Sequence, residues 1–541
     1  MIQMKPFMWL RPIFYLILLL CSPVILLAQS PPLTFKNPIL PGFSPDPSIC
    51  RVGEDYYLAT SSFVWFPAMP VYHSKDLVNW ELIGHGIDRL GLVKFDGLRD
   101  RSGIWAVTIR HHNGLFYLIT TSAEGGGGNF YITANNPAGP WSDPIWLKDA
   151  PGVDPSLFWD DDGKCYYTGN TWDLKREWPG QCAVWLQELD LTQKKLVGPR
   201  KQLTFGYANN AAFAEGPHIY KVDGKYLLLN SEGGTDQFHA IVAHHSNSIW
   251  GPYVSDKINP VLSHRQLGKE YPIQAVGHGD LVETQNGEWW ATVLGKRIIG
   301  GQVPLSRETF LAKINFEEGT PIFNPGDSRI LIEQQRPDLP WSPFPATHSR
   351  DEFEGDKLNV KWHFVRIPEK PFFKLDKGQL SLHLQPQVVD SLKNSAMILQ
   401  KIQHQKFYAT TRISFETLKD DEQAGMILYR NSESYYLLLK EKNSLVLIKK
   451  HNGKKEFVTK VPYSKSTAYL SVKVNDLKVQ FSFGESENDM VAIGPVQNLA
   501  VIAESSVNRF NGPGIGIYAT SNGQKSAANS KFDWFEYAEQ K

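Results

Sequence analysis

Cysteine is scarce in this chain, with 4 residues among 541. One of them, Cys21, lies in an apolar N-terminal segment, which leaves Cys50, Cys165 and Cys182 for the rest of the chain. An odd number of thiols cannot all pair within one molecule. A disulfide between Cys165 and Cys182 and two buried free thiols are both compatible with the sequence. In either case the fold must depend on apolar cores and not on disulfide bonds.

An excess of charge of either sign is also missing, because 56 Lys and Arg residues balance 56 Asp and Glu residues. This balance argues against the broad electrostatic attraction that binds nucleic acids or anionic membranes, and no nucleic-acid partner is expected. The 16 Trp and 21 Tyr residues supply many flat faces, which stack on sugar rings or fill β-sheet cores.

An apolar run of spanning length is missing even from the N-terminus. Lys5 and Arg11 precede apolar residues between positions 13 and 27, and Pro23 interrupts them. This order is typical of a signal peptide over residues 1–28. A membrane anchor is the alternative, but the uninterrupted run is short for a spanning helix. We therefore expect an exported protein, periplasmic or extracellular, with no stable membrane insertion after cleavage.

Long helical periodicity is missing between residues 34 and 310, where a repeated phrase takes its place. Each copy has an opening residue, a strand-like stretch, a turn that contains glycine, and then paired aromatic or apolar residues. The opening residues of the five copies are Asp46, Trp105, Asp154, Glu215 and His278. The copies begin roughly 50 to 60 residues apart, close to the length of a four-stranded propeller blade. The pattern argues against an α/β barrel and predicts an all-β protein in which residues 29–335 form a five-bladed β-propeller.

The second half of the chain has a different pattern. A proline-rich linker over residues 336–350 precedes alternating runs such as residues 380–384 and 470–474. Such runs, separated by turn signals, predict an antiparallel β-sandwich or jelly roll over residues 351–541.

Closure of the five copies into a ring would bring their opening residues to one mouth of a central channel. Hydrolysis of a glycosidic bond with inversion needs one carboxylate to activate water and one carboxylic acid to protonate the leaving oxygen, about 6.5–9.5 Å apart. We interpret Asp46 as the base and Glu215 as the acid, with the charge of Asp154 raising the pKa of the acid. Turn chemistry is the alternative for any single Asp-Pro pair. It does not account for three acidic residues at equivalent positions.

Four stretches that contain these residues also carry a family resemblance. They are Pro41-Gly42-Phe43-Ser44-Pro45-Asp46-Pro47-Ser48, Gly152-Val153-Asp154-Pro155-Ser156, Glu215-Gly216-Pro217-His218 and Gly277-His278-Gly279-Asp280-Leu281. In this order they resemble glycoside hydrolase family 43, the β-xylosidase and α-L-arabinofuranosidase family. The resemblance implies a five-bladed propeller and an inverting mechanism, with Asp46 as general base, Asp154 as the pKa-modulating carboxylate and Glu215 as general acid. It also implies that the second half is a concanavalin-like sandwich that helps to close the pocket, which favours exo action.

Four further residues are candidates for substrate binding. Arg307 resembles the arginine of the family's Gly-Arg-Glu-Thr phrase, which binds the sugar, although Ser306 replaces the glycine here, and a surface ion pair with Glu308 or another acid is the alternative. Phe63 and Trp105 resemble the apolar walls of the family's pocket, and the alternative is that they fill the propeller core. His278 would lie on the channel axis, where some family members hold a metal ion, often calcium. A core histidine is the equal alternative, because calcium prefers several oxygen ligands. No cofactor is expected to be required, and a structural calcium ion near His278 stays open as one of these two alternatives.

We therefore expect a β-1,4-xylosidase that releases xylose from the non-reducing ends of xylo-oligosaccharides or xylan of the plant cell wall. An α-L-arabinofuranosidase acting on arabinoxylan or arabinan side chains is the alternative within the family. The shape of the pocket, and not the acidic set, separates these two activities. A non-catalytic carbohydrate-binding propeller is disfavoured by the intact acidic set.

Overall fold

The computed structural model describes Met1, residues 30–505 and residues 509–540. Within these residues the secondary structure consists of β-strands and one short 3-10 helix, η1 (Leu499–Ile502). The all-β prediction is therefore confirmed. In this described part of the chain, no helix is long and apolar enough to cross a membrane. The signal peptide expected over residues 1–28 falls outside the described residues, apart from Met1, and stays a prediction.

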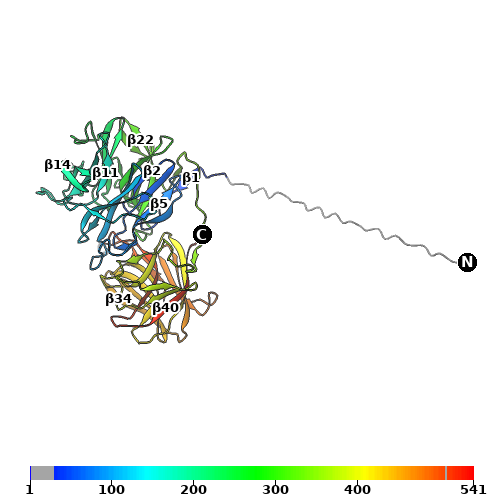
Figure 1. The fold of residues 1–541 in the computed structure, drawn as a ribbon. Helices are drawn as coiled ribbons and strands as arrows, with labels where there is room; N and C mark the ends of the chain where they lie inside the picture. The colour runs from blue at the N-terminus through cyan, green and yellow to red at the C-terminus, as the bar shows by residue number, and fades with distance from the viewer. Residues whose placement is uncertain (2–29, 506–508, 541) are drawn as a thin grey trace. The chain divides into compact units, whose positions relative to one another are not determined.

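Five antiparallel sheets follow one another between residues 48 and 323, each with four strands in chain order and one with an additional strand (Figure 1). The first strands of the five sheets are β2 (Ser48–Val52), β7 (Gly103–His112), β11 (Ser156–Trp159), β15 (Glu215–Val222) and β20 (Ile273–Glu283). The other strands are β3 (Asp55–Ala59), β5 (Ala68–Ser74), β6 (Glu81–Ile87), β8 (Leu115–Ala123), β9 (Gly128–Ala134), β10 (Ile145–Trp146), β12 (Cys165–Thr171), β13 (Ala183–Asp190), β14 (Lys195–Thr204), β16 (Lys225–Glu232), β17 (Ala240–Ser246), β18 (Val254–Ser255), β19 (Leu262–Ser263), β21 (Trp289–Arg297), β22 (Arg307–Glu317) and β23 (Thr320–Phe323). Each first strand turns back into the second through the tight turn of its repeat copy. At the Asn113-Gly114 turn both residues have positive φ angles, as short hairpin turns require.

The first strands surround a common axis. Each of them contacts the first strand of the next sheet, and β20 contacts β2, so the contacts close into a ring. The chain ends of this ring are joined by pairing of β1 (Thr34–Lys36) with β24 (Glu333–Gln335). Separate apolar clusters fill the spaces between neighbouring sheets, with side chains from both sheets in each cluster. We call the five first strands the inner strands below.

Two further sheets make up the second half of the chain. One contains β25 (Arg350–Asp351), β27 (Phe373–Leu375), β28 (Leu380–His383), β30 (Lys406–Ser414), β35 (Thr467–Asn475), β36 (Lys478–Gly484), β37 (Val491–Ala492), β38 (Gln497–Asn498) and β40 (Asn529–Glu539). The other contains β29 (Ala396–Lys401), β31 (Gln423–Asn431), β32 (Ser434–Glu441), β33 (Ser444–His451), β34 (Lys454–Pro462) and β39 (Gly514–Thr520). In β35 every second residue is buried, which is the alternation that the sequence showed. In β31 and β32 nearly every residue is buried, so both faces of this sheet are covered.

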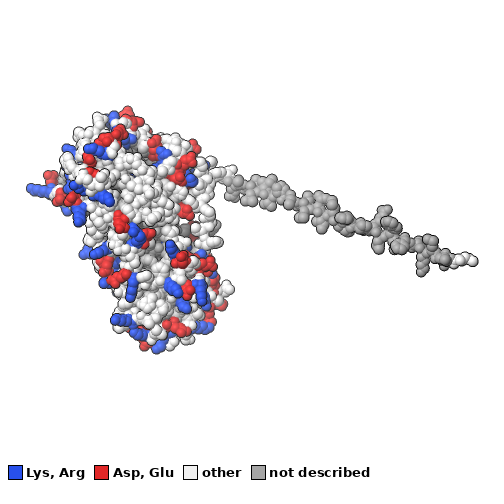
Figure 2. All heavy atoms as spheres, in the orientation of Figure 1, with Lys and Arg blue, Asp and Glu red and all other residues white. Residues whose placement is uncertain are grey.

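The propeller and the sandwich share a core. Residues of both belong to the largest apolar cluster, and β26 (Phe364–Val365) pairs with β4 (Trp65–Phe66) across the junction. The buried guanidinium of Arg366 donates to Asp100 Oδ1 over 2.8 Å at the same junction. Residues 34–541 accordingly form one compact unit. On the face drawn in Figure 2, basic and acidic side chains are interspersed, in keeping with their equal totals.

The three cysteines of the described residues are free and buried. Cys165 and Cys182 form no disulfide, so of the two alternatives the buried free thiols are correct. Burial raises the pKa of Cys182 to about 12, which keeps this thiol protonated and unreactive at neutral pH.

Candidate active site

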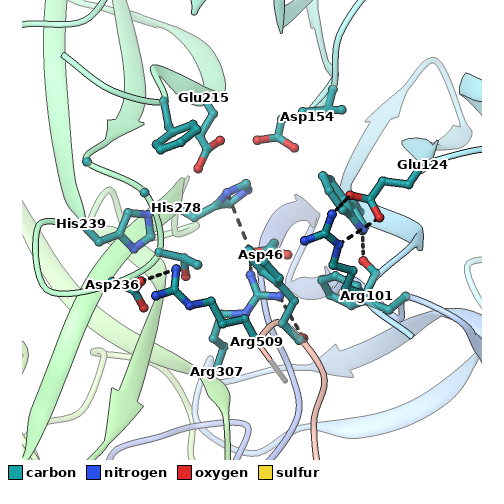
Figure 3. Close-up of a pocket in the computed structure, with 18 of the residues that line it drawn as sticks. Asp46, Arg101, Glu124, Asp154, Glu215, Asp236, His239, His278, Arg307 and Arg509 are labelled. Carbon is teal, nitrogen blue, oxygen red and sulfur yellow. Dashed lines mark hydrogen bonds and ion pairs between the residues drawn. The ribbon is translucent and has the colours of Figure 1, made fainter. Parts of the chain in front are cut away.

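A pocket of about 410 Å³ opens near the starts of the inner strands. Its lining includes all seven residues that the sequence singled out, namely Asp46, Phe63, Trp105, Asp154, Glu215, His278 and Arg307. Figure 3 shows the carboxyl groups of Asp46, Asp154 and Glu215, which lie at or just before three different inner strands, pointing into the same space. The sandwich contributes Arg509 and Phe510 to the lining.

Asp46 and Asp154 occupy equivalent backbone positions. Each lies two residues before an inner strand, and their φ angles are 53° and 55°. This left-handed region is sparsely populated by residues other than glycine and costs on the order of 1–3 kcal/mol. Glu215 is instead the first residue of β15, ahead of a β-bulge between Glu215 and His218 that re-aims its side chain. The same strain at two equivalent positions, with both carboxyl groups in the pocket, argues against turn chemistry alone.

Asp46 is surrounded by groups that favour its ionised form. Its Oδ2 accepts a hydrogen bond from Ser61 Oγ at 2.6 Å, and its Oδ1 accepts one from Arg307 Nη1 at 3.0 Å. Burial by itself would raise the pKa of Asp46. The electrostatic interactions with Arg307 and His278 and the hydrogen bond from Ser61 outweigh this effect. The pKa of Asp46 is therefore lowered below its ordinary value, as a carboxylate base requires.

The other two carboxyl groups are shifted in the opposite direction. Burial and the charge of Asp46 raise the pKa of Asp154 to about 6, although His278 and a hydrogen bond from the Gly216 N–H act against the rise. The pKa of Glu215 is raised well above its ordinary value, first by burial and then by the charges of Asp154 and Asp46. Carboxyl groups whose environments separate their pKa values are typical of an acid and a base in one site.

Arg307 faces the pocket and is only 4% exposed. It opens β22, and its neighbour Glu308 points to the opposite face of the strand, where it binds Arg297 with two contacts of 2.7 Å. Arg307 is buried and its acidic partner is Asp46 in the pocket, so the alternative of a surface ion pair with Glu308 or another acid is wrong. Arg307 Nη2 also donates to the carbonyl oxygen of Phe510 at 3.1 Å, which ties the sandwich to the pocket.

Aromatic rings form one wall of the pocket. The rings of Phe63 and Trp105 lie 6.1 Å apart, and the ring of Phe510 stacks on both at 6.4 and 6.3 Å. Phe63 is also a member of the apolar core, so this residue both lines the pocket and fills the core. Trp105 is half-buried and donates its indole N–H to the carbonyl oxygen of Arg101 at 2.9 Å, which fixes its plane. Such a wall suits the apolar C–H face of a sugar.

His278 lies beside Asp46, with its Nδ1 3.9 Å from Asp46 Oδ1. Calcium takes six to eight oxygen ligands. Asp46 is already bound to Arg307 and Ser61, and no group of three or more His, Cys, Asp or Glu side chains in the described residues could hold a metal ion. The residues around His278 therefore do not fit a calcium ion. His278 itself lines the pocket and stays a candidate contact for the substrate.

Several lining residues were not found from the sequence. Two ion pairs, Arg101 with Glu124 and Arg509 with Asp236, line the pocket at 2.9 Å each (Figure 3). None of these residues belongs to the repeated phrase, and Arg509 is far away in the sequence. His239 was missed as well, and its burial lowers its pKa to about 3, so this imidazole is neutral.

A ring of sheets fused to a sandwich, with three carboxyl groups and an arginine in a small aromatic-walled pocket, defines a propeller glycosidase. Residues 35–321 match the family model of glycosyl hydrolases family 43, and residues 350–538 match that of the beta xylosidase C-terminal concanavalin A-like domain. The chain belongs to glycosyl hydrolases family 43.

Relatives and solved structures extend this assignment over nearly the whole chain. A xylosidase/arabinosidase of Butyrivibrio fibrisolvens is 38% identical over 523 residues, which cover 93% of this chain and 99% of the relative. A non-reducing end alpha-L-arabinofuranosidase of Bacteroides ovatus is 35% identical, with 93% and 94% covered. The crystal structure of a xylan beta-1,4-xylosidase from Bacillus halodurans superposes with a TM-score of 0.88 at 34% identity, with 93% of this chain and 100% of that chain covered.

Proposed function

We propose that this protein is an inverting, exo-acting β-1,4-xylosidase that releases xylose from the non-reducing ends of xylo-oligosaccharides or xylan. One observation carries the proposal. In a single pocket, the pKa of Asp46 is lowered, which favours its carboxylate, and the pKa of Glu215 is raised well above its ordinary value, which favours its protonated form. A base and an acid on one sugar are what inverting hydrolysis needs.

In the proposed reaction Asp46 removes a proton from a water molecule, whose oxygen attacks the anomeric carbon. The bond from this carbon to the leaving oxygen breaks, and Glu215 gives its proton to that oxygen. Asp154 acts on the acid through its charge, because a neighbouring negative charge disfavours ionisation of Glu215. The proton gained by Asp46 and the proton lost by Glu215 then exchange with solvent, which restores the starting state.

The sugar would be held by Arg307, the aromatic wall and His278. A guanidinium donates to adjacent hydroxyl groups of a sugar, and Arg307 lines the pocket. Phe63 and Trp105 offer ring faces to the apolar side of the pyranose.

Exo action is supported by the size and the composition of the pocket. Its volume of about 410 Å³ suits one or two sugar units, and Phe510 of the sandwich packs against the wall residues Phe63 and Trp105. A small pocket completed by the sandwich favours the end of a chain over its middle.

An α-L-arabinofuranosidase is the second candidate, because one of the similar proteins bears that name and another is named for both activities. Paired 4-nitrophenyl substrates test the choice. We expect a kcat/KM for the β-D-xylopyranoside well above that for the α-L-arabinofuranoside at equal pH. A higher value for the arabinofuranoside would overturn the preference for xylose and retain the hydrolytic site.

Export is part of the same proposal. The charged and apolar pattern of residues 1–28 supports delivery to the periplasm or the exterior, where fragments of plant cell-wall xylan are available. N-terminal sequencing of the mature protein tests this, and we expect it to begin just after Ala28. An unprocessed N-terminus in the secreted or periplasmic fraction would contradict it.

A further inference from the structure

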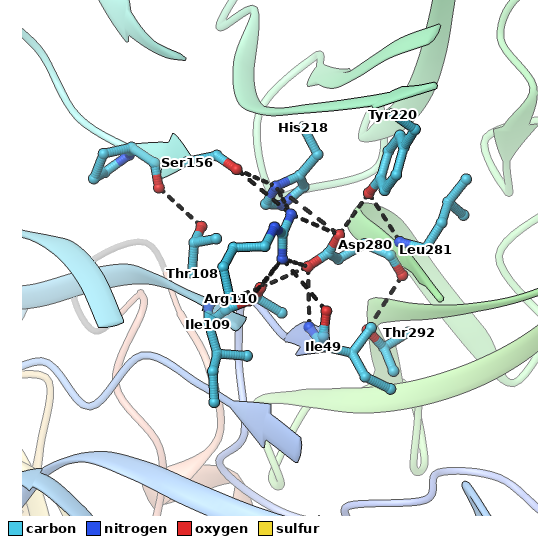
Figure 4. Close-up of polar contacts among 12 residues, drawn as sticks. Ile49, Thr108, Ile109, Arg110, Ser156, His218, Tyr220, Asp280, Leu281 and Thr292 are labelled. Carbon is cyan, nitrogen blue, oxygen red and sulfur yellow. Dashed lines mark hydrogen bonds and ion pairs between the residues drawn. The ribbon is translucent and has the colours of Figure 1, made fainter. Parts of the chain in front are cut away.

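Arg110 lies in β7 at the point where the inner strands meet, and it has no part in the pocket lining (Figure 4). Its guanidinium makes two contacts with Asp280 of β20, at 2.7 and 3.1 Å. It also donates to Ser48 Oγ of β2 at 3.1 Å and to His218 Nδ1 of β15 at 2.9 Å, and it reaches Ser156 Oγ of β11 at 3.5 Å. One side chain therefore touches residues of all four other inner strands.

The partners of Arg110 stand in a fixed relation to the pocket. Ser48 lies two residues after Asp46, Ser156 two residues after Asp154, and Asp280 two residues after His278. Each of these three partners is therefore linked to a pocket residue through a single intervening residue. His218 follows Glu215 by three residues, because a β-bulge lies between them. The guanidinium is thus bound two or three residues along the chain from each proposed acid, base or modulating group.

The hydrogen bonds around the Arg110 guanidinium have defined directions. A guanidinium only donates, so His218 Nδ1 must accept, and its proton is on Nε2. Burial lowers the pKa of His218 to about 3, which agrees with a neutral ring. Asp280 is wholly buried and also accepts from Ser48 Oγ, the Ile49 N–H and Tyr220 Oη. All of these donors lie on inner strands.

We propose that Arg110 is a positioning residue for hydrolysis: its guanidinium supplies the positive charge on the propeller axis and sets the spacing of Asp46, Asp154 and Glu215 across the pocket. The proposal rests on the roles proposed for those three residues. The cation on the axis is a side chain of the protein itself. The spacing of the acid and the base then does not depend on a bound divalent ion.

The test compares Arg110→Lys and Arg110→Gln with wild type, with Arg51→Met as the matched control. Arg51 also links β2 to the end of β20, by donating to the Glu283 carbonyl oxygen at 2.7 Å, but it is exposed. Each variant is first checked for folding by far-UV circular dichroism.

We expect kcat of Arg110→Gln to fall by about 100-fold, because a displacement of about 1 Å between reacting groups has an effect of this size. KM should change little, since Arg307 and the aromatic wall are retained, and Arg110→Lys, which keeps the charge, should recover part of kcat.

Three results would overturn the proposal. In the first, folded Arg110→Gln keeps the kcat of wild type, or loses no more than Arg51→Met. In the second, Arg110→Gln does not fold and Arg110→Lys folds with unchanged kcat, which leaves only a role in stability. In the third, wild-type activity is lost on dialysis against a chelator and restored by calcium, which places the axial charge on a metal ion. A failure of the proposed function itself would appear differently, as retained turnover in Glu215→Gln.

Discussion

Arg307 Nη1 donates to Asp46 Oδ1 at 3.0 Å, and the guanidinium carbon of Arg307 lies 5.1 Å from the centre of the Phe63 ring. One buried arginine thus joins the proposed base, the aromatic wall and, through its bond to the Phe510 carbonyl oxygen, the sandwich. The ionisation state of Asp46 follows from this contact, since burial without it would raise the pKa.

Replacement of Arg307 by Met should move the acidic limb of the kcat/KM profile to higher pH. Wild-type Asp46 has a lowered pKa and remains ionised down to acidic pH, and loss of the cation removes the largest contribution that opposes burial. KM should rise as well, because the sugar loses a donor. The measurement is kcat/KM against pH. Arg297→Met, which removes the partner of Glu308 on the other face of β22, should leave the acidic limb in place. An acidic limb that does not move in Arg307→Met would exclude this role.

Replacement of Asp154 by Asn should move the alkaline limb to lower pH. Glu215 acts as an acid only while protonated, and the charge of Asp154 is one cause of its raised pKa. Asn keeps the shape and removes the charge, so Glu215 loses its proton at lower pH. The same change at the exposed Asp161, which pairs with Lys221 outside the pocket, is the control and should have no effect. An alkaline limb that stays in place or moves upward in Asp154→Asn would refute the modulating role.

Replacement of Glu215 by Gln should cost about 10²–10⁴-fold in kcat on substrates with poor leaving groups, the usual contribution of a general acid. The loss should be much smaller for a dinitrophenyl xyloside, whose leaving group departs without protonation. Comparison of kcat/KM for xylobiose and the dinitrophenyl substrate in both proteins measures this. Equal losses on the two substrates would show that Glu215 is not the acid.

The repeated phrase was enough to predict five equivalent strand openings and to name the three acids that the structure brings to one pocket. Each of these residues sits at a strand start with a local signal, such as Asp-Pro before β2 and β11. Arg110 carries no such signal, because it lies inside β7 and its partners come from four other strands. Phe510 and Arg509 were also missed, since their place in the pocket depends on how the sandwich packs on the propeller. Long-range packing of this kind leaves no periodic mark in the sequence.

Replacement of Phe510 by Ala should raise KM and lower kcat/KM by about tenfold, since its ring stacks on Phe63 and Trp105 and such contacts contribute about 0.5–1.5 kcal/mol beyond the area they bury. Phe457→Ala is the matched control, because this phenylalanine of the sandwich is 67% exposed. Steady-state kinetics on xylobiose provide the comparison. If both variants behave as wild type, the sandwich does not complete the pocket.

Replacement of Arg366 by Met should lower the free energy of unfolding by about 3–5 kcal/mol, because it leaves Asp100 buried without its partner. Asp100 also accepts from the backbone N–H and Oγ of Ser432, so the loss falls on the junction of propeller and sandwich. Urea unfolding followed by fluorescence measures it. Lys442→Met, which breaks the exposed pair with Asp420, should cost less than about 1 kcal/mol. Similar losses in the two variants would mean that the junction ion pair contributes no more to the free energy of unfolding than an exposed ion pair does.

The stereochemistry of the first product tests the account most directly. If Asp46 activates water while Glu215 protonates the leaving oxygen, a β-linked xyloside must give α-xylose in the first turnovers. Proton NMR of the anomeric signals, recorded before mutarotation, distinguishes the two anomers. We predict that the α anomer appears first and the β anomer grows in only later. Initial release of β-xylose would contradict the pairing of Asp46 and Glu215 as base and acid.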